Sequence, residues 1–415
     1  MLTTAKISLT KNDVADRAAK TDRICILHHT GDRSINNKED GQCPFGRNGS
    51  VTNGIVGRDY GEYLRLDSLL SNVDMMSARY LPEPVHDEHL FITTHQTQEM
   101  WFKQILFEID SIRDTFPERD SLDDRQCTTI SQRLHRISVI WNVLIEHFTI
   151  LQTMQPVDFM RFRHLLAPGS GFQSLQFRLI ECKLGLTMKQ RGNPTAVCGA
   201  FSPPMQSTLT KAISEPSVLD LVNQWLDNMD TADFAAQYTE AVREYLSDEQ
   251  QQFDQEPDAH RREMLSRNLA QQKQVFEVVL DRSKYEEEVQ TKKRRMSYNA
   301  FMSALKITFY RTEQRFQSAY AILTALVDID SAMSKWRFAH ITTAQRMLGS
   351  KSGPYSSGYL YLRSTIGDRY KIFLDLINVS SHLLPEPYIP PLSFHRNGTL
   401  FPRPVNDVLL AGKQI

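Results

Sequence analysis

The sequence predicts an all-α protein, and three observations support this fold class. Apolar side chains recur at intervals of three and four residues over most of the chain after about residue 58, which is the period of an amphipathic helix. The alternation of apolar and polar residues that marks a half-buried strand is almost absent. No segment repeats along the chain, so a solenoid is not expected.

Composition and charge limit the classes of molecule that this protein is expected to bind. The 415 residues include 48 basic and 49 acidic side chains, giving a formal net charge of -1, so no global field favours nucleic acid or an anionic membrane. The five cysteines are scattered without a CxxC pair, which disfavours a disulfide framework and a zinc cluster. The N-terminus lacks the pattern of a signal peptide, and no apolar run reaches about 18 residues. We therefore expect a cytoplasmic protein that binds a small molecule or another protein.

Ordered structure is expected to begin near residue 58. Residues 1–57 are poor in apolar side chains and rich in turn formers, so they are predicted to form a disordered extension. Tyrosines and leucines at helical spacing follow in YGEYLRLDSLL. The next two helices are indicated by apolar stripes over 91–112 and 130–151, the second ended by Pro156. A third helix is predicted from the GSGFQS turn through QFRLIECKLG.

The second half of the chain divides by composition. Residues 203–297 hold charged, glutamine-rich helices of low apolar density, which is typical of a peripheral helical insertion, and the KKRR run at 292–295 is expected to be a solvated face. Apolar helix returns after residue 298, and Gly349 is expected to cap the end of KWRFAHITTAQRMLG. A last apolar helix is predicted through RYKIFLDLINV. The predicted organisation is a helical domain of 58–202 and 298–395, an insertion of 203–297 and a tail of 396–415.

Two histidines lie on the apolar faces of different predicted helices. His95 is four residues after Phe91 on the first stripe, and His340 shares a face with Trp336. A single inward histidine is usually a hydrogen-bonded core residue. Zinc and non-haem iron need three or four converging ligands, whereas a haem needs one histidine and a wide apolar slot. The spacing leaves core packing and haem ligation both open.

A basic cluster follows Pro156 in VDFMRFRHLL. Most such clusters are solvated faces. If an arginine of this cluster turned inward, its planar guanidinium would match a carboxylate with two parallel hydrogen bonds. The adjacent PGSGFQS turn could also present helix N-terminal amides to an anion, although a short glycine turn is a weak indication.

Four longer segments follow one another along the chain and are considered together: HDEHLFITTHQTQEMWFKQ, PVDFMRFRHLLAPGSGFQSLQFRLIE, DIDSAMSKWRFAHITTAQRMLGSK and SSGYLYLRSTIGDRYKIFLDL. The set resembles the tryptophan 2,3-dioxygenase family, over about residues 60–391 and most loosely between about 200 and 297. The resemblance implies an all-helical haem-binding bundle that assembles as a homotetramer with one haem b per subunit. It also implies cleavage of the indole C2–C3 bond of L-tryptophan by O2 to N-formyl-L-kynurenine, the first step of the kynurenine pathway.

The resemblance further implies roles for single residues. His340 matches the proximal ligand of the haem iron, with Trp336 as its neighbour. His95 matches the distal histidine that hydrogen-bonds the indole N–H, and Arg163 matches the arginine that holds the substrate carboxylate. The remaining matches line the pocket: Phe91 and Phe159 as aromatic walls, Ser170 and Gly171 beside the haem, and Tyr60, Tyr63 and Leu64 reaching a neighbouring subunit's pocket.

One loop departs from the family pattern. The family reads GTGGSSG, with a threonine that contacts the substrate ammonium, whereas residues 353–358 read GPYSSG, one residue shorter and without that threonine. Pro354 removes a backbone donor and fixes φ. The departure leaves an alternative, a related haem enzyme that oxygenates a modified tryptophan or indole without ring cleavage. A further alternative is a helical assembly protein without cofactor, in which both histidines are core residues.

Overall fold

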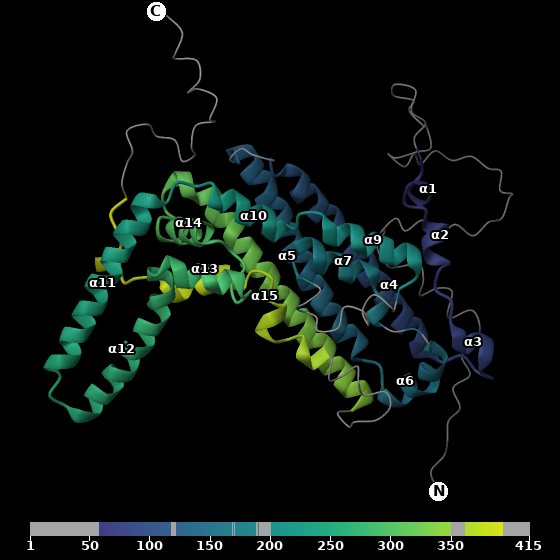
Figure 1. Cartoon of the computed structure of the whole chain (residues 1–415). Coiled ribbons are helices and arrows are strands. Elements are labelled where there is room, and N and C mark those ends of the chain that lie inside the picture. The colour runs from purple at the N-terminus through teal and green to yellow at the C-terminus, as the bar shows by residue number, and fades with distance from the viewer. Residues whose placement is uncertain are drawn as a thin grey trace, which may run out of the picture. The chain divides into compact units, whose positions relative to one another are not determined.

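The computed structural model describes residues 58–117, 122–167, 169, 171–187, 190, 201–349 and 362–392. Within these ranges every regular element is a helix (Figure 1), which confirms the all-α prediction. The predicted extension at 1–57, the tail at 396–415, Ser170 and the 353–358 loop lie outside them. The chain divides into two units, Met1–Leu69 and Leu70–Ile415, which are described separately.

The N-terminal unit contributes one short helix and most of a second. Helix α1 (Tyr60–Leu64) begins at Asp59, whose carboxylate accepts the Glu62 N–H at 2.8 Å, and α2 spans Leu66–Leu70. The large side chains predicted here at helical spacing are exposed, at 71% for Tyr60 and 74% for Tyr63. A short helix whose large side chains are exposed gains little stability from its own packing. Contacts with other surfaces are therefore needed to stabilise it.

Three long helices build the centre of the second unit. They are α4 (His86–Thr115), α5 (Asp124–Leu151) and α15 (Gln314–Leu348), and α5 packs against both of the others. Helix α5 starts at a capping box in which Asp123 and Gln126 satisfy each other's backbone N–H groups. The predicted stripe on α5 is buried throughout: Ile130, Leu134, Ile137, Trp141, Leu144, Phe148 and Leu151.

A side chain in the first turn of α4 binds the N-terminus of the short helix α3 (Met76–Tyr80). The first turn of α4 carries two exposed histidines, His86 and His89, but Glu88 in the same turn is fully buried. The Glu88 carboxylate accepts the backbone N–H of Met76 at 2.9 Å and of Ser77 at 2.8 Å. It therefore caps α3 from outside, because the first N–H groups of a helix have no partner within it.

Two shorter helices follow α5. Helix α6 (Pro156–Arg163) begins at Pro156, and it packs against α4 and α15. After the 3-10 turns η1 (His164–Leu166) and η2 (Gly171–Gln173), helix α7 (Leu175–Leu184) confirms the third predicted helix. It ends at Gly185, where φ is 128° and L side chains are disfavoured.

Residues 203–297 form five helices: α9 (Pro203–Ser214), α10 (Val218–Asp227), α11 (Ala232–Gln255), α12 (Ala259–Leu280) and α13 (Arg282–Gln290). Helices α11 and α12 run side by side as a hairpin (Figure 1). Helix α10 instead packs on α14 (Tyr298–Phe309) and buries Val218, Leu219, Val222, Trp225 and Leu226. The boundaries of the insertion stay a prediction.

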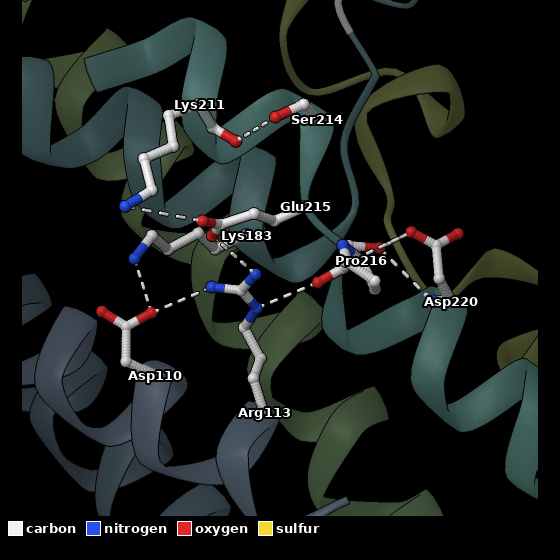
Figure 2. A network of polar contacts seen from close by, with 9 residues as sticks. Asp110, Arg113, Lys183, Lys211, Ser214, Glu215, Pro216 and Asp220 are labelled. Carbon is white, nitrogen blue, oxygen red and sulfur yellow. Dashed lines mark hydrogen bonds and ion pairs between the residues drawn. The ribbon is translucent and has the colours of Figure 1, made fainter. Parts of the chain in front are cut away.

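A network of ion pairs fixes the turn between α9 and α10 (Figure 2). Arg113 of α4 donates to Glu215 at 2.9 Å and to the Pro216 carbonyl at 2.9 Å. It also donates to Asp110, which pairs with Lys183 of α7. The hydrogen bond from Arg113 holds the pKa of Glu215 below its usual value. The network joins α4, α7 and the α9–α10 turn.

The expected solvated face at 292–295 is wrong for its two arginines. These residues follow α13 rather than lying within a helix. Arg294 lies 4.7 Å from the Tyr285 ring, and Arg295 donates to the Ile372 carbonyl at 3.0 Å. The backbone N–H of Arg295 is bound by Asp375 at 2.6 Å. Contacts with residues far along the chain therefore override the local charge pattern.

The C-terminal part confirms one prediction and corrects another. Helix α15 is capped by Gly349, as expected. The last apolar helix is shorter than predicted, because only Leu374–Asn378 (α17) is α-helical, between the 3-10 turns η4 (Asp368–Tyr370) and η5 (Val379–His382); η6 (Glu386–Tyr388) follows. The reason is Asp330 of α15, whose carboxylate takes the backbone N–H groups of Ile372 and Phe373 at 2.9 and 2.7 Å.

Among the described residues, no single helix is long and apolar enough to cross a membrane. Helix α5 and the 156–166 segment pass that test only as a pair, across a bend of 94°.

Candidate active site

His95 lies on α4 and presents one ring nitrogen as an acceptor. Its Nδ1–H donates to the Phe91 carbonyl at 2.7 Å. Burial lowers the pKa of His95 below its ordinary value of 6.5, so the ring is neutral at pH 7. In a neutral imidazole that carries its proton on Nδ1, Nε2 is a hydrogen-bond acceptor.

The surroundings of His95 combine access and desolvation. Solvent reaches the side chain, yet protein atoms surround it closely enough to disfavour the charged form. The side chain of His95 is therefore exposed in this chain, although the apolar stripe predicted that it would point inward. A ligand that met His95 here would leave water for a largely protein environment.

Phe91 lies beside His95 and belongs to a cluster of three phenylalanines. The Phe91 ring lies 4.1 Å from the His95 ring, 5.9 Å from Phe159 and 5.6 Å from Phe162. Phe159 and Phe162 both come from α6 and meet edge to face at 5.4 Å. The contacts of α6 with α4 therefore create an aromatic wall next to an imidazole.

Arg163 ends α6, directly after the fully buried Phe162. The side chain is half-buried, and its Nη1 lies 4.0 Å from Met160 Sδ. Arg161 on the same helix is more exposed and pairs with Asp158 at 3.8 Å. The two arginines thus occupy different environments only two residues apart.

His340 lies on α15 between two aromatic rings. The Phe148 ring stacks on it at 5.8 Å with an interplanar angle of 19°, and the Trp336 ring lies 5.3 Å away. Burial lowers the pKa of His340 to about 4, and a smaller contribution comes from His95. His340 is consequently a neutral imidazole at pH 7, the form that binds metal.

His340 fits ligation of a haem, because it is a neutral imidazole that lies against the rings of Phe148 and Trp336. Its buried Nδ1 has no hydrogen-bond partner among the residues described, as is also the case for His147 Nδ1. Nowhere in the described ranges do three or more His, Cys, Asp or Glu side chains gather as a multi-ligand metal site would need. One neutral imidazole on a broad aromatic face is what a haem requires of the protein.

A second aromatic layer supports Trp336. Phe177 of α7 stacks on it at 4.8 Å, and Phe102 and Trp141 each lie 5.9 Å away. Trp336 is buried, at 8% exposed. Close packing of rings on several sides restricts the rotation of Trp336 and, through it, the position of the neighbouring His340.

The predicted site residues fall into two groups of contacts. Phe91, His95 and Phe159 lie together where α6 meets α4, and Trp336 and His340 lie together on α15. Arg163 ends α6. Gly171 begins η2. Tyr60, Tyr63 and Leu64 belong to the N-terminal unit, and Ser170 and the 353–358 loop lie outside the described residues.

The sequence reasoning missed three aromatic residues of the site, Phe148, Phe162 and Phe177. Phe148 lies on the predicted stripe of α5, so its burial was predictable. Its contact with His340 was not, because an apolar stripe does not say which residue of another helix covers it.

The fold and the site together define an all-helical protein in which two neutral histidines and a nearby arginine stand among aromatic rings. The family model described as "Tryptophan 2,3-dioxygenase" matches residues 47–383. The chain belongs to this family, as the sequence resemblance suggested.

Relatives agree over nearly the whole length. The chain is 39% identical over 371 residues to tryptophan 2,3-dioxygenase A of Danio rerio, covering 88% of this chain and 90% of the relative. It is 40% identical over 364 residues to tryptophan 2,3-dioxygenase B of Danio rerio, covering 86% and 88%. It is 39% identical over 368 residues to tryptophan 2,3-dioxygenase of Xenopus laevis, covering 87% and 90%.

Proposed function

We propose that this chain is a haem dioxygenase that cleaves the indole C2–C3 bond of L-tryptophan with O2. The product is N-formyl-L-kynurenine, and the reaction is the first step of tryptophan degradation by the kynurenine pathway. The observation that carries the proposal is His340, a neutral imidazole that lies against the rings of Phe148 and Trp336, in a chain that belongs to this family.

His340 holds the iron of one haem b per subunit in this proposal. The neutral ring, the buried Nδ1 without a partner in the described part of the chain, and the flanking rings of Phe148 and Trp336 support this role. The family resemblance would put Ser170 and Gly171 beside the haem as well. When bound, haem supplies the activation of O2, and the protein supplies orientation and exclusion of water.

His95 receives the indole of the substrate. Its Nε2 is a lone-pair acceptor because Nδ1–H is already donated to the Phe91 carbonyl. An indole N–H donates to such an acceptor, and the rings of Phe91 and Phe159 pack on the indole faces. A protonated His95 would offer a second donor in place of the acceptor, so the lowered pKa of His95 keeps the ring in its binding form.

Arg163 binds the carboxylate of L-tryptophan. The guanidinium fork matches a carboxylate with two charge-assisted hydrogen bonds. Its position after Phe162 at the end of α6 puts a charged group next to the aromatic wall, so one amino acid could span both. The ammonium contact that the family threonine makes has no counterpart in GPYSSG, and we assign none.

We also propose a cytoplasmic homotetramer in which α1 reaches the pocket of a neighbouring subunit through Tyr60, Tyr63 and Leu64. Support comes from the exposure of these three side chains, at 71, 74 and 42%, because large apolar rings on a short helix favour a covering surface. Cys127 and Cys182 are free thiols, as is usual in a reducing compartment.

The test is a spectrum and a turnover assay on purified, haem-supplemented protein. We expect a Soret band, and formation of N-formyl-L-kynurenine from L-tryptophan and O2. His340→Ala should lose the Soret band. His382→Ala is the matched control, because His382 is also buried and packs on Phe276 and Phe301. Wild-type protein with a Soret band but no product would refute the proposed reaction, and equal haem loss in both variants would remove His340 as the ligand.

A further inference from the structure

A buried ionic triad joins α7 to α15, the helix that carries His340. Glu181 of α7 accepts a hydrogen bond from Arg178 Nη1 at 3.0 Å on Oε2, and one from Arg337 Nη2 at 2.9 Å on Oε1. The side chains of Glu181, Arg178 and Arg337 are exposed by only 2, 9 and 4%. Charges at this depth are tolerated when each is paired and hydrogen-bonded.

The two bonds to Glu181 differ in what they connect. Arg178 precedes Glu181 by three residues, so that pair lies within α7. Arg337 lies on α15, three residues before His340, so its pair joins two helices. Arg337 Nη1 also donates to the Tyr370 carbonyl at 3.4 Å, and its guanidinium lies 5.7 Å from the Tyr370 ring. A single arginine therefore fixes the helix of His340 against α7 and η4.

The triad lies next to the rings that support His340. Phe177 directly precedes Arg178, and Trp336 directly precedes Arg337. These two rings stack at 4.8 Å with an interplanar angle of 28°, and Trp336 in turn lies 5.3 Å from His340. The Glu181 bridge and the Phe177–Trp336 stack thus hold the same relative position of α7 and α15.

The backbones of α7 and α15 hardly approach each other. Long side chains therefore carry their contact. A helix rises about 1.5 Å per residue, so a slide of one residue would take Glu181 Oε1 away from Arg337 and the face of Phe177 away from Trp336. The bond between Glu181 and Arg337 resists such a slide because a charge-assisted hydrogen bond depends on direction.

We propose that Glu181 is a positioning residue for His340. Through its bond to Arg337 it locks α7 against α15 and sets the orientation of Trp336 and His340 toward the cofactor. The inference rests on the proposed function, because it takes His340 as the haem ligand. It assigns Glu181 no contact with substrate or haem.

Three substitutions separate positioning from ordinary stability. In Glu181→Gln, the side-chain amide has one acceptor oxygen and one donor NH2 group in place of two acceptor oxygens. One of the two arginines therefore loses its acceptor and faces the NH2 group instead. Arg337→Gln removes the bond between helices. Arg178→Gln is the matched control, because it removes a buried arginine from the same carboxylate but only a bond within α7.

The readouts are the iron–histidine stretching band of the ferrous protein by resonance Raman, and the haem affinity measured by transfer to excess apomyoglobin. We expect Glu181→Gln and Arg337→Gln to shift or split the band and to weaken haem binding about 10- to 100-fold, as loss of a ligand's supporting partner does. Arg178→Gln should unfold at lower denaturant while keeping the band and haem affinity of the wild type.

If all three variants lose stability and keep the wild-type band, the triad is only structural and the inference is overturned. If Glu181→Gln does not fold, Arg337→Lys decides, because a single ammonium cannot bind both Glu181 and the Tyr370 carbonyl as the guanidinium does. A shifted band would support the inference, and an unshifted one would overturn it. Wild-type protein without an iron–histidine band would instead refute the proposed ligand, before any variant is made.

Discussion

Truncating Phe148 to alanine removes the ring that stacks on His340. Phe148 is 4% exposed, and its ring lies 5.6 Å from Trp336 and 5.8 Å from His340. Replacing a buried phenylalanine by alanine costs about 3–5 kcal/mol, and each aromatic pair is worth roughly 0.5–1.5 kcal/mol beyond its buried area. Two such pairs place this substitution in the upper half of the range, so we expect the free energy of unfolding to fall by about 4 kcal/mol.

The assay is urea unfolding of the apoprotein, followed by circular dichroism, with haem affinity measured separately. Haem affinity should fall as well, because the His340 ring loses the neighbour that limits its rotation. Phe316→Ala is the matched control: Phe316 is 1% exposed, lies on α15 far along the helix from His340, and its ring lies 6.1 Å from Tyr310. It should lose similar stability and keep haem affinity. A loss below about 1.5 kcal/mol for Phe148→Ala would contradict the packing contribution assigned to the Phe148 ring. Equal loss of haem affinity in both variants would contradict its effect on His340.

Three further predictions concern substrate, pH and stability. Arg163→Leu should weaken L-tryptophan binding by about 2–5 kcal/mol in steady-state kinetics, whereas Arg161→Leu, which removes an exposed ion pair, should leave KM unchanged; equal effects would remove Arg163 from the site. Burial lowers the pKa of His95 below 6.5, so the neutral acceptor persists as pH falls through 6.5 and kcat/KM should drop only at lower pH; a midpoint at or above 6.5 would contradict this. Glu88→Gln should lower the free energy of unfolding by about 2–3 kcal/mol, because one of the two bonds to backbone N–H groups loses a charged acceptor; an unchanged urea midpoint would count against it.

The long helices were predictable because their burial follows a local period. Every residue of the predicted α5 stripe is buried, and Gly349 ends α15 where the pattern ends. The last helix was overestimated for a reason that no local window contains. Asp330, which is 42 residues from Ile372, binds the backbone groups that a longer helix would need. The 292–295 run failed in the same way, since Asp375 lies 80 residues from Arg295.

The candidate site was predictable in part. Helical spacing put His95 and His340 on apolar faces, but spacing alone left core packing and haem ligation both open. The structure adds the neutral state of the two rings and the Phe148 ring beside His340. These depend on which helices pack together, and on burial, which a periodic pattern does not report. The Glu181 bridge was invisible for the same reason, because Arg337 meets it from 156 residues away.

The central claim is oxidative cleavage of the indole ring. The most direct test is mass spectrometry of the product formed by haem-loaded wild-type protein from L-tryptophan in isotopically labelled O2. The account predicts N-formyl-L-kynurenine that carries both labelled oxygen atoms. A product that gains one labelled atom and keeps the indole ring closed would contradict ring cleavage. That result would favour the alternative, a related haem enzyme that oxygenates without cleavage of the ring.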